Sequence, residues 1–184
     1  MQQLAVIGDG ARTEESERVV SFRIGSEVLA VAVGRVTEIV RPRQITEVPQ
    51  VPIFVKGVVN LRGRIIPVLS LRVRLGLEEQ ETTESTRIVV VTVADESVGM
   101  IVDAVEQVVS IPNSAVTPPS PVFVSVDADF VRGIARIGDS QLVVLLDVDR
   151  VTDRHAAAEP GRVSLGPVAG TPSLPAAPDG AVAP

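Results

Sequence analysis

Hydrophobic and polar residues alternate along much of this chain, beginning at about residue 18. Val20, Phe22 and Ile24 alternate with Ser21 and Arg23, which is the period of two of a strand with one buried face. Runs of the same kind, bounded by Gly, Pro or charged residues, predict further strands. The strands that we expect cover residues 18–24, 28–33, 36–40, 57–62, 64–69, 87–93, 98–102, 106–109, 131–137 and 141–146.

Local signals between these strands predict a hairpin and two short helical segments. Arg62 and Gly63 separate two strand-like runs, so we expect a hairpin that turns at these residues. A short helix is expected over residues 70–76, with Ser70 as its N-cap and a glycine at its end. Asp147 is expected to cap a last helical turn after the final strand.

The second half of the patterned region repeats the first half with a period of about 70 residues. The segments that correspond are 29–40 with 98–109, Val48-Pro49 with Thr117-Pro118, Lys56-Gly57 with Arg132-Gly133, and 68–70 with 145–147. This period is too long for a solenoid repeat. We infer two similar β-barrels of about five strands each, because closure removes exposed strand edges. The groove between two such units is a natural place for a partner.

Both ends of the chain lack the alternation, which divides the sequence into three parts. Residues 1–17 are expected to form a flexible arm, and residues 18–153 form the patterned domain. Residues 155–184 hold six Pro, four Gly and eight Ala. We therefore expect a disordered tail over residues 154–184.

Composition supports a β-rich domain and excludes several classes of protein. The chain has 36 Val and 12 Ile but only 2% aromatic residues, and β-branched residues favour strands. The net charge is −6 without a basic run, which argues against nucleic-acid binding. Cys is absent, which excludes disulfides and thiolate chemistry. No apolar run is long enough for membrane insertion, and no leader is recognisable, so we expect a cytoplasmic protein.

Candidate catalytic residues are few, and none forms a convincing site. His155 is the only histidine and lies in the expected tail, and Lys56 is the only lysine and precedes a turn glycine. Asp127 and Asp129 lack the Gly and distal Glu of a calcium loop. Paired carboxylates for glycoside hydrolysis remain an alternative on spacing alone, although such sites usually have aromatic platforms. We expect no enzyme activity, no cofactor and no metal site.

One segment, residues 57–72, reads GVVNLRGRIIPVLSLR. It resembles the hallmark G-V-x-N-L-R-G-x-I-x-P-V-x-D-L-R of the CheW family, the adaptors of bacterial chemotaxis arrays, with Ser70 where Asp is usual. Residues 36–39 match the V-x-E-I strand of the family, and residues 98–105 match its V-G-x-x-V-D-x-V pattern. The resemblance covers roughly residues 18–153.

The resemblance implies an all-β fold of two intertwined five-stranded SH3-like β-barrels with short helical turns. It also implies a non-catalytic adaptor that couples the cytoplasmic tips of methyl-accepting chemoreceptors to the regulatory domain of the histidine kinase CheA. The family contacts its receptors in the groove between the barrels. The receptor-binding residues that this implies are Val36, Glu38, Ile39, Gly57, Arg62, Gly99 and Val108. Kinase contact is implied at the barrel ends, and we expect a monomer in isolation that assembles into arrays.

Two of these residues are expected to act together, and one is ambiguous. Arg62 lies at a hairpin turn and Glu38 on a strand that runs nearby in the family fold, so we expect an ion pair that shapes the receptor site. Gly57 is expected to need a positive φ or a close backbone approach, and a structural role and a binding role both remain open. The alternative functions are an adaptor of another receptor–kinase pathway, such as pilus motility, and a small β-barrel hydrolase.

Overall fold

Strands dominate the computed structural model, which describes residues 15–119, 126–137 and 141–153. The strands are β1 (Ser16–Ile24), β2 (Glu27–Ala32), β3 (Val36–Val40), β4 (Val55–Leu61), β5 (Arg64–Ser70), β6 (Arg87–Val93), β7 (Glu96–Val102), β8 (Ala104–Pro112), β9 (Val131–Ile137) and β10 (Gln141–Leu146). The helices are the short α1 (Leu71–Arg74) and α2 (Val148–Thr152), with 3-10 turns η1 (Val33–Arg35), η2 (Asn113–Ala115) and η3 (Ala128–Phe130). None of these described helices is long and apolar enough to span a membrane.

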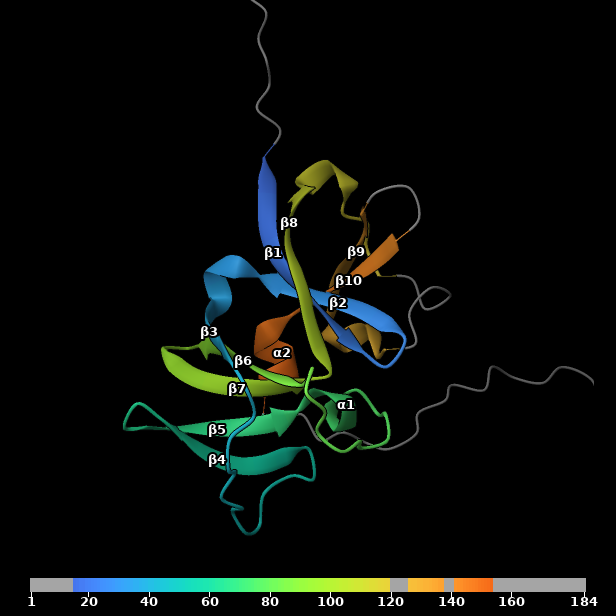
Figure 1. Cartoon of the computed structure of the whole chain (residues 1–184). Coiled ribbons are helices and arrows are strands. Elements are labelled where there is room, and N and C mark those ends of the chain that lie inside the picture. The colour runs from blue at the N-terminus through green and yellow to red at the C-terminus, as the bar shows by residue number, and fades with distance from the viewer. Residues whose placement is uncertain (1–14, 120–125, 138–140, 154–184) are drawn as a thin grey trace, which may run out of the picture.

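The strands form two five-stranded sheets, and each sheet takes strands from both halves of the sequence (Figure 1). Sheet A has the order β8-β1-β2-β10-β9, and sheet B has the order β3-β6-β7-β5-β4. Each of the strands β1 to β5 has a counterpart in β6 to β10, in the same order along the chain. Replacing every strand by its counterpart converts the order of sheet A into that of sheet B. The fold is therefore all-β with two intertwined units, as predicted.

The sequence repeat is reproduced by the strand register. In the parallel pair β5–β7, Val68 faces Gly99, and in the parallel pair β10–β2, Leu145 faces Ala30. Val68 and Leu145 were aligned in the repeat, and Ala30 and Gly99 were aligned as well. The proposed equivalence of these strands is therefore confirmed residue by residue.

One part of the repeat alignment is wrong. Thr46 bridges Val58, whereas Thr117 bridges Ile134, so the counterpart of Thr117 is Thr46 rather than Val48. The second half has two more residues before this bridge, in a region where β8 has nine residues against five in β3 and is followed by η2.

The same bridges curl each sheet into a small barrel. The chain that continues from the edge strand β3 reaches the opposite edge strand β4, where the backbone amides of Thr46 and Val58 each donate to the carbonyl of the other at 2.9 Å. Thr117 and Ile134 make the equivalent pair of bonds at 2.8 Å between the segment after β8 and strand β9. These bonds satisfy edge groups that would otherwise be exposed, which gives each sheet the form of an SH3-like barrel.

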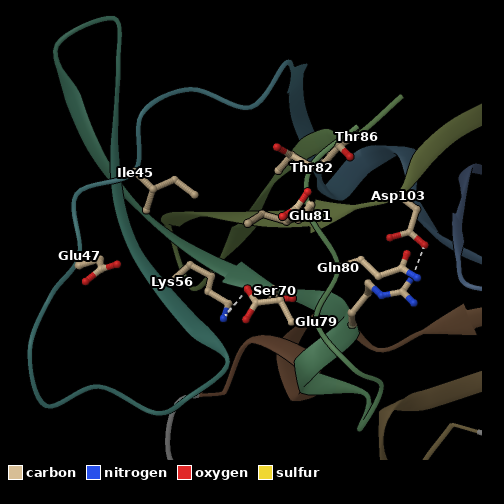
Figure 2. Close-up of a pocket in the computed structure, with 12 residues that line it drawn as sticks. Ile45, Glu47, Lys56, Ser70, Glu79, Gln80, Glu81, Thr82, Thr86 and Asp103 are labelled. Carbon is tan, nitrogen blue, oxygen red and sulfur yellow. Dashed lines mark hydrogen bonds and ion pairs between the residues drawn. The ribbon is translucent and has the colours of Figure 1, made fainter. Parts of the chain in front are cut away.

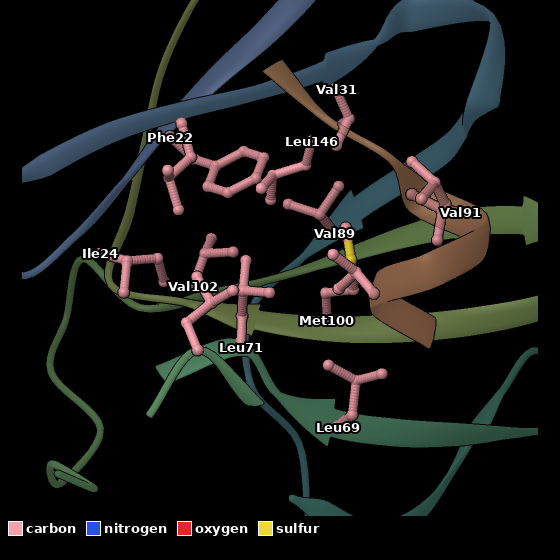
Figure 3. Packing of buried hydrophobic residues seen from close by; sticks show 14 of the residues in the cluster. Phe22, Ile24, Val31, Leu69, Leu71, Val89, Val91, Met100, Val102 and Leu146 are labelled. Atoms are coloured by element: carbon pink, nitrogen blue, oxygen red, sulfur yellow. The ribbon is translucent and has the colours of Figure 1, made fainter. Parts of the chain in front are cut away.

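The largest hydrophobic cluster lies between the barrels rather than within either one. It combines Phe22 and Leu146 of sheet A with Val89 and Met100 of sheet B (Figure 3). Val151 of α2 also belongs to it. Two smaller clusters fill the interiors of the individual barrels, one formed by sheet A and one by sheet B. Because the shared cluster is the largest, the barrels are expected to fold and unfold together.

Strands with two buried faces explain where the period of two is lost. In β6, Ile88 and Val90 pack inside sheet B, whereas Val89 and Val91 pack against the other barrel. In β1, Ser21 belongs to the face that we read as polar, but it is buried, and its hydroxyl donates to the carbonyl of Gln107 at 3.0 Å.

The predicted caps are confirmed, whereas several predicted strand ends move, most of all those of β8, which covers Ala104–Pro112 rather than residues 106–109. The side chain of Ser70 accepts from the amide of Val73 at 3.4 Å, and that of Asp147 accepts from the amide of Asp149 at 3.1 Å. Strand β1 begins at Ser16, which pairs with Pro112, so the expected N-terminal arm was two residues too long. Residues 1–14 of that arm and the expected tail after residue 153 lie outside the described residues.

Candidate functional site

The turn between β4 and β5 presents Arg62 to the surface. Leu61 pairs with Arg64, which leaves Arg62 and Gly63 as a two-residue loop with φ values of 53° and 85°. Two positive φ values in a two-residue hairpin match the twist of the strands on either side. The side-chain carbonyl of Asn60 accepts from the amide of Gly63 at 2.8 Å and fixes the loop. The Arg62 side chain is consequently 85% exposed.

Arg62 and Glu38 form the ion pair that was expected from the sequence. The Nη2 atom of Arg62 lies 3.4 Å from the Oε2 atom of Glu38, whose side chain is only 24% exposed. Glu38 lies on β3 and Arg62 follows β4, at opposite ends of the strand order of sheet B. The pair thus spans the seam where this barrel closes. Exposed pairs of this kind contribute about 0–1 kcal/mol to stability, so the guanidinium remains available to a partner.

Ile39 and Val108 are the exposed apolar residues among the predicted site. They are 40% and 50% exposed, and they occupy equivalent positions in the two halves, since Ile39 pairs with Val89 and Val108 with Val20. Ile39 lies at the edge of sheet B, and Val108 lies at the edge of sheet A. Val36, on the same strand as Ile39, is partly buried and packs against the shared core.

The two glycines of the predicted site are buried, so neither offers a contact surface of its own. Gly57 has a φ of 135°, and a Cβ atom there would lie 2.1 Å from the carbonyl oxygen of Thr46. Both the positive φ and the close approach that we predicted are confirmed. A Cβ atom on Gly99 would lie 2.8 Å from Ile88 and 3.1 Å from Val68. Any effect of these glycines on a partner must pass through the packing of β4 and β7.

Arg74 is a buried cation that sequence reasoning did not identify. Its guanidinium lies 4.3 Å from the ring centre of Phe54 and 4.7 Å from that of Phe130. It donates to the carbonyls of Val151 and Asp153 at 2.9 Å each. Burial lowers the pKa of Arg74, and the carboxylate of Asp153 opposes that effect. Phe54 and Phe130 are counterparts in the repeat, so Arg74 marks the approximate two-fold axis between the barrels.

A polar cavity of about 230 Å³ lies beside α1 (Figure 2). Its two cations are paired with carboxylates: Lys56 with Glu79 at 2.6 Å, and Arg72 with Asp103 at 2.5 Å. Lys56 lies within β4 and its side chain is only 21% exposed, so it is a partly buried, paired cation rather than a charge on a solvated loop. Within the described ranges, no group of His, Cys, Asp and Glu is arranged to hold a metal ion.

Asp103 is a second residue whose role the sequence did not reveal. One oxygen of its carboxylate accepts from the amide of Gly25 at 2.7 Å and from Arg72 at 2.5 Å. The sequence clue to a role for Asp103 was its place in the motif of residues 98–105. The contact joins the β1–β2 turn of sheet A to α1, the helix that directly follows β5 of sheet B.

Comparisons with known proteins agree on one family. A family model described as CheW-like domain matches residues 18–156. The chemotaxis protein CheW of Helicobacter pylori is 33% identical over 145 residues, which cover 77% of this chain and 87% of that protein. The crystal structure of the scaffolding protein TtCheW from Thermoanaerobacter tengcongensis superposes with a TM-score of 0.70 at 32% identity, covering 74% of this chain and 92% of that one.

A more partial match is a relative that does not carry the name CheW. The protein PilI of Pseudomonas aeruginosa is 30% identical over 115 residues, which cover 62% of this chain and 65% of PilI. The family match, in contrast, takes in most of the described residues. The chain belongs to the CheW-like domain family.

Proposed function

We propose that the chain is a non-catalytic adaptor that couples chemoreceptors to the histidine kinase CheA in chemotaxis. The observation that carries the proposal is the Arg62–Glu38 pair, which lies within the segments that match the CheW hallmark. An exposed guanidinium held over a turn offers directional donors to the carbonyls or carboxylates of a partner. Scaffolding requires such surfaces and does not require a preorganised catalytic constellation.

The receptor surface that we propose comprises the exposed side chains of Ile39, Arg62 and Val108, with Glu38 and Val36 supporting them. The two apolar residues give small contact areas, and Arg62 supplies the polar anchor. Aromatic and Arg residues commonly carry most of the binding energy of an interface. Gly57 and Gly99 contribute by allowing close packing within sheet B, the sheet that carries Ile39 and Arg62.

The kinase surface that we propose is the apolar end of sheet B formed by the loop from Val48 to Ile53. This loop lies below β4 in Figure 1. Ile53 is 78% exposed, and Val48 and Val51 are exposed as well. Val48 and Val51 border a cavity of about 130 Å³ whose lining includes Phe54 and Leu69. An exposed apolar patch beside a cavity is typical of a protein interaction site, and it would meet the regulatory domain of CheA.

A ternary binding experiment tests the adaptor function. Receptor cytoplasmic fragments, titrated into a preformed complex of the chain with the CheA of the same bacterium, should leave the kinase bound. Displacement of the kinase by receptor would contradict the proposal, because an adaptor must hold both partners on the cytoplasmic side at once. The second candidate function is an adaptor of a pilus pathway, which the partial similarity to PilI supports. The same titration with the receptor and kinase of a pilus pathway distinguishes the two candidates.

The contribution of Arg62 is tested by one substitution with a matched control. Arg62→Ala should weaken receptor binding by about tenfold, within the range of interface residues whose truncation costs 1–2 kcal/mol, and should leave the melting temperature nearly unchanged. Arg64→Ala removes an exposed arginine from the same hairpin and serves as the control. Equal receptor affinity in the wild type and in Arg62→Ala would contradict the assignment.

A further inference from the structure

The chain crosses from one barrel to the other at two equivalent places. After β2 it leaves sheet A through η1 and enters sheet B as β3, and after β7 it leaves sheet B at Asp103 and enters sheet A as β8. Each crossover directly precedes one of the edge strands that carry the proposed receptor surface. The position of Ile39 relative to Val108 therefore depends on how these two crossovers are held.

At the second crossover, Asp103 is bonded to both barrels. Its backbone amide donates to the carbonyl of Arg23 in sheet A at 3.1 Å. Its carboxylate accepts from Arg72 of α1, the helix that follows sheet B, and from the amide of Gly25 in the β1–β2 turn. The Arg72 side chain is only 13% exposed, so water screens this pair less than an ordinary surface pair.

At the first crossover, Arg35 is likewise bonded to both barrels. Its Nε atom donates to the carbonyl of Thr92 on β6 of sheet B at 3.0 Å. Its terminal nitrogen pairs with Asp149 of α2, the helix that follows sheet A. This pair is more exposed than the one at Asp103, so it is expected to contribute less.

The two contacts are similar in the two halves but have opposite polarity, and their crossover residues are offset by one position in the repeat. Arg72 lies two residues after the cap Ser70, and Asp149 lies two residues after the cap Asp147. In one half the helix provides the cation and the crossover provides the anion, and in the other half the roles are exchanged. Each crossover is thus tied to the neighbouring helix by an ion pair, but through different residues.

We propose that the ion pairs Arg72–Asp103 and Arg35–Asp149 are positioning contacts that fix β3 relative to β8 and so set the geometry of the receptor surface. The inference rests on the proposed function for its link to receptors. The placement of the strands, however, can be measured without any partner. Of the two pairs, Arg72–Asp103 should dominate because it is less exposed.

The absence of cysteine from the sequence makes a direct distance measurement possible. Spin labels at Arg41→Cys, beyond the end of β3, and Ser110→Cys, on β8, would report the separation of the two edge strands. The positions are both exposed and are counterparts in the repeat. Asp103→Asn and Arg72→Gln each remove one charge of the dominant pair. Arg132→Gln is the control, because its ion pair with Glu17 joins two strands of the same sheet.

In both variants of the dominant pair, the distance distribution should broaden or shift, whereas the control should match the parent. Binding of a receptor cytoplasmic fragment should weaken by about twofold to thirtyfold, the range found for residues that couple sites without touching the ligand. The double variant Arg72→Asp with Asp103→Arg should restore both readouts only in part, because it returns an ion pair of reversed order while the amide of Gly25 loses its acceptor.

Three results would count against the inference, and they are distinguishable from failure of the proposed function. An unchanged distance distribution in both single variants would overturn it, as would a changed distribution with unchanged receptor affinity. Equal broadening in Arg132→Gln would show that any lost ion pair has the same effect. Failure of the proposed function would instead appear as no receptor binding by the parent chain, while the distance measurement would still decide whether the pairs position the strands.

Discussion

Arg74 shows how far a single residue can depart from its expected environment. Charged residues are almost never fully buried unless they are paired, and nothing in the short helix expected over residues 70–76 pointed to a buried arginine. In the structure it is 1% exposed, enclosed by two phenylalanine rings and by carbonyls at the end of α2. No local pattern could reveal this, because the two rings come from different halves of the chain.

Removing the donors of Arg74 should be costly. Arg74→Met keeps an apolar chain of similar length between the rings but leaves the carbonyls of Val151 and Asp153 without this donor. Unsatisfied buried groups cost about 1–3 kcal/mol each, so we expect the free energy of unfolding in urea to fall by about 2–4 kcal/mol. Arg64→Met, at an exposed position, is the control. A loss no larger than that of the control would contradict the structural role of Arg74.

The buried Gly57 gives a second prediction at the residue scale. Gly57→Ala places a Cβ atom 2.1 Å from the carbonyl oxygen of Thr46 at a φ of 135°. Backbone strain of this kind costs about 1–3 kcal/mol, and the bond between Thr46 and Val58 that closes the barrel must also shift. We expect a clearly lowered melting temperature. Gly34→Ala, where a Cβ atom would meet nothing, should be nearly neutral, and equal melting temperatures for the two variants would contradict this explanation.

At the scale of elements, alternation and caps were sufficient to place the strands and the short helices. The runs around residues 87–93 and 98–102 could be recognised because β-branched residues gather where a strand is buried. Alternation reports whether a side chain is buried but not which strand lies beside it. For this reason we could not predict which hydrophobic cluster each residue of β6 joins. The two-residue shift at Thr117 could not be predicted either.

The two helix caps should differ in strength although they are counterparts in the repeat. Ser70 accepts one amide hydrogen bond at 3.4 Å, whereas Asp147 accepts two and also lies 3.6 Å from Arg150. Loss of an N-cap costs about 0.5–2 kcal/mol. We expect Ser70→Ala near the lower end of that range and Asp147→Ala near the upper end, as measured by urea unfolding. The opposite order would show that burial of Ser70 outweighs the number of bonds.

At the scale of the whole molecule, exchange of strands makes two repeats into one unit. Sheet A cannot form from the first half alone, because β8, β9 and β10 come from the second half. The repeat in the sequence indicated two similar barrels, whereas the exchange was implied by the family resemblance and not by the repeat. A consequence is that the proposed receptor surface, with Ile39 on one sheet and Val108 on the other, depends on both halves being folded.

The described core ends with α2, which allows a prediction about the boundary of the functional unit. Val148 and Val151 are buried in the shared cluster, and the carbonyl of Asp153 accepts a bond from Arg74. The sequence beyond this point is rich in Pro, Gly and Ala, a composition that cannot bury enough apolar surface to offset the entropy of ordering.

A chain that ends at Arg154 should therefore keep the melting temperature of the full chain, elute as a monomer at micromolar concentration, and bind receptor and kinase with unchanged affinity. A chain that ends at Asp147 is the matched control and should be strongly destabilised, because it lacks α2 and the partners of Arg74. If the chain that ends at Arg154 lost binding to receptor or kinase, the segment after Arg154 would itself be a docking element.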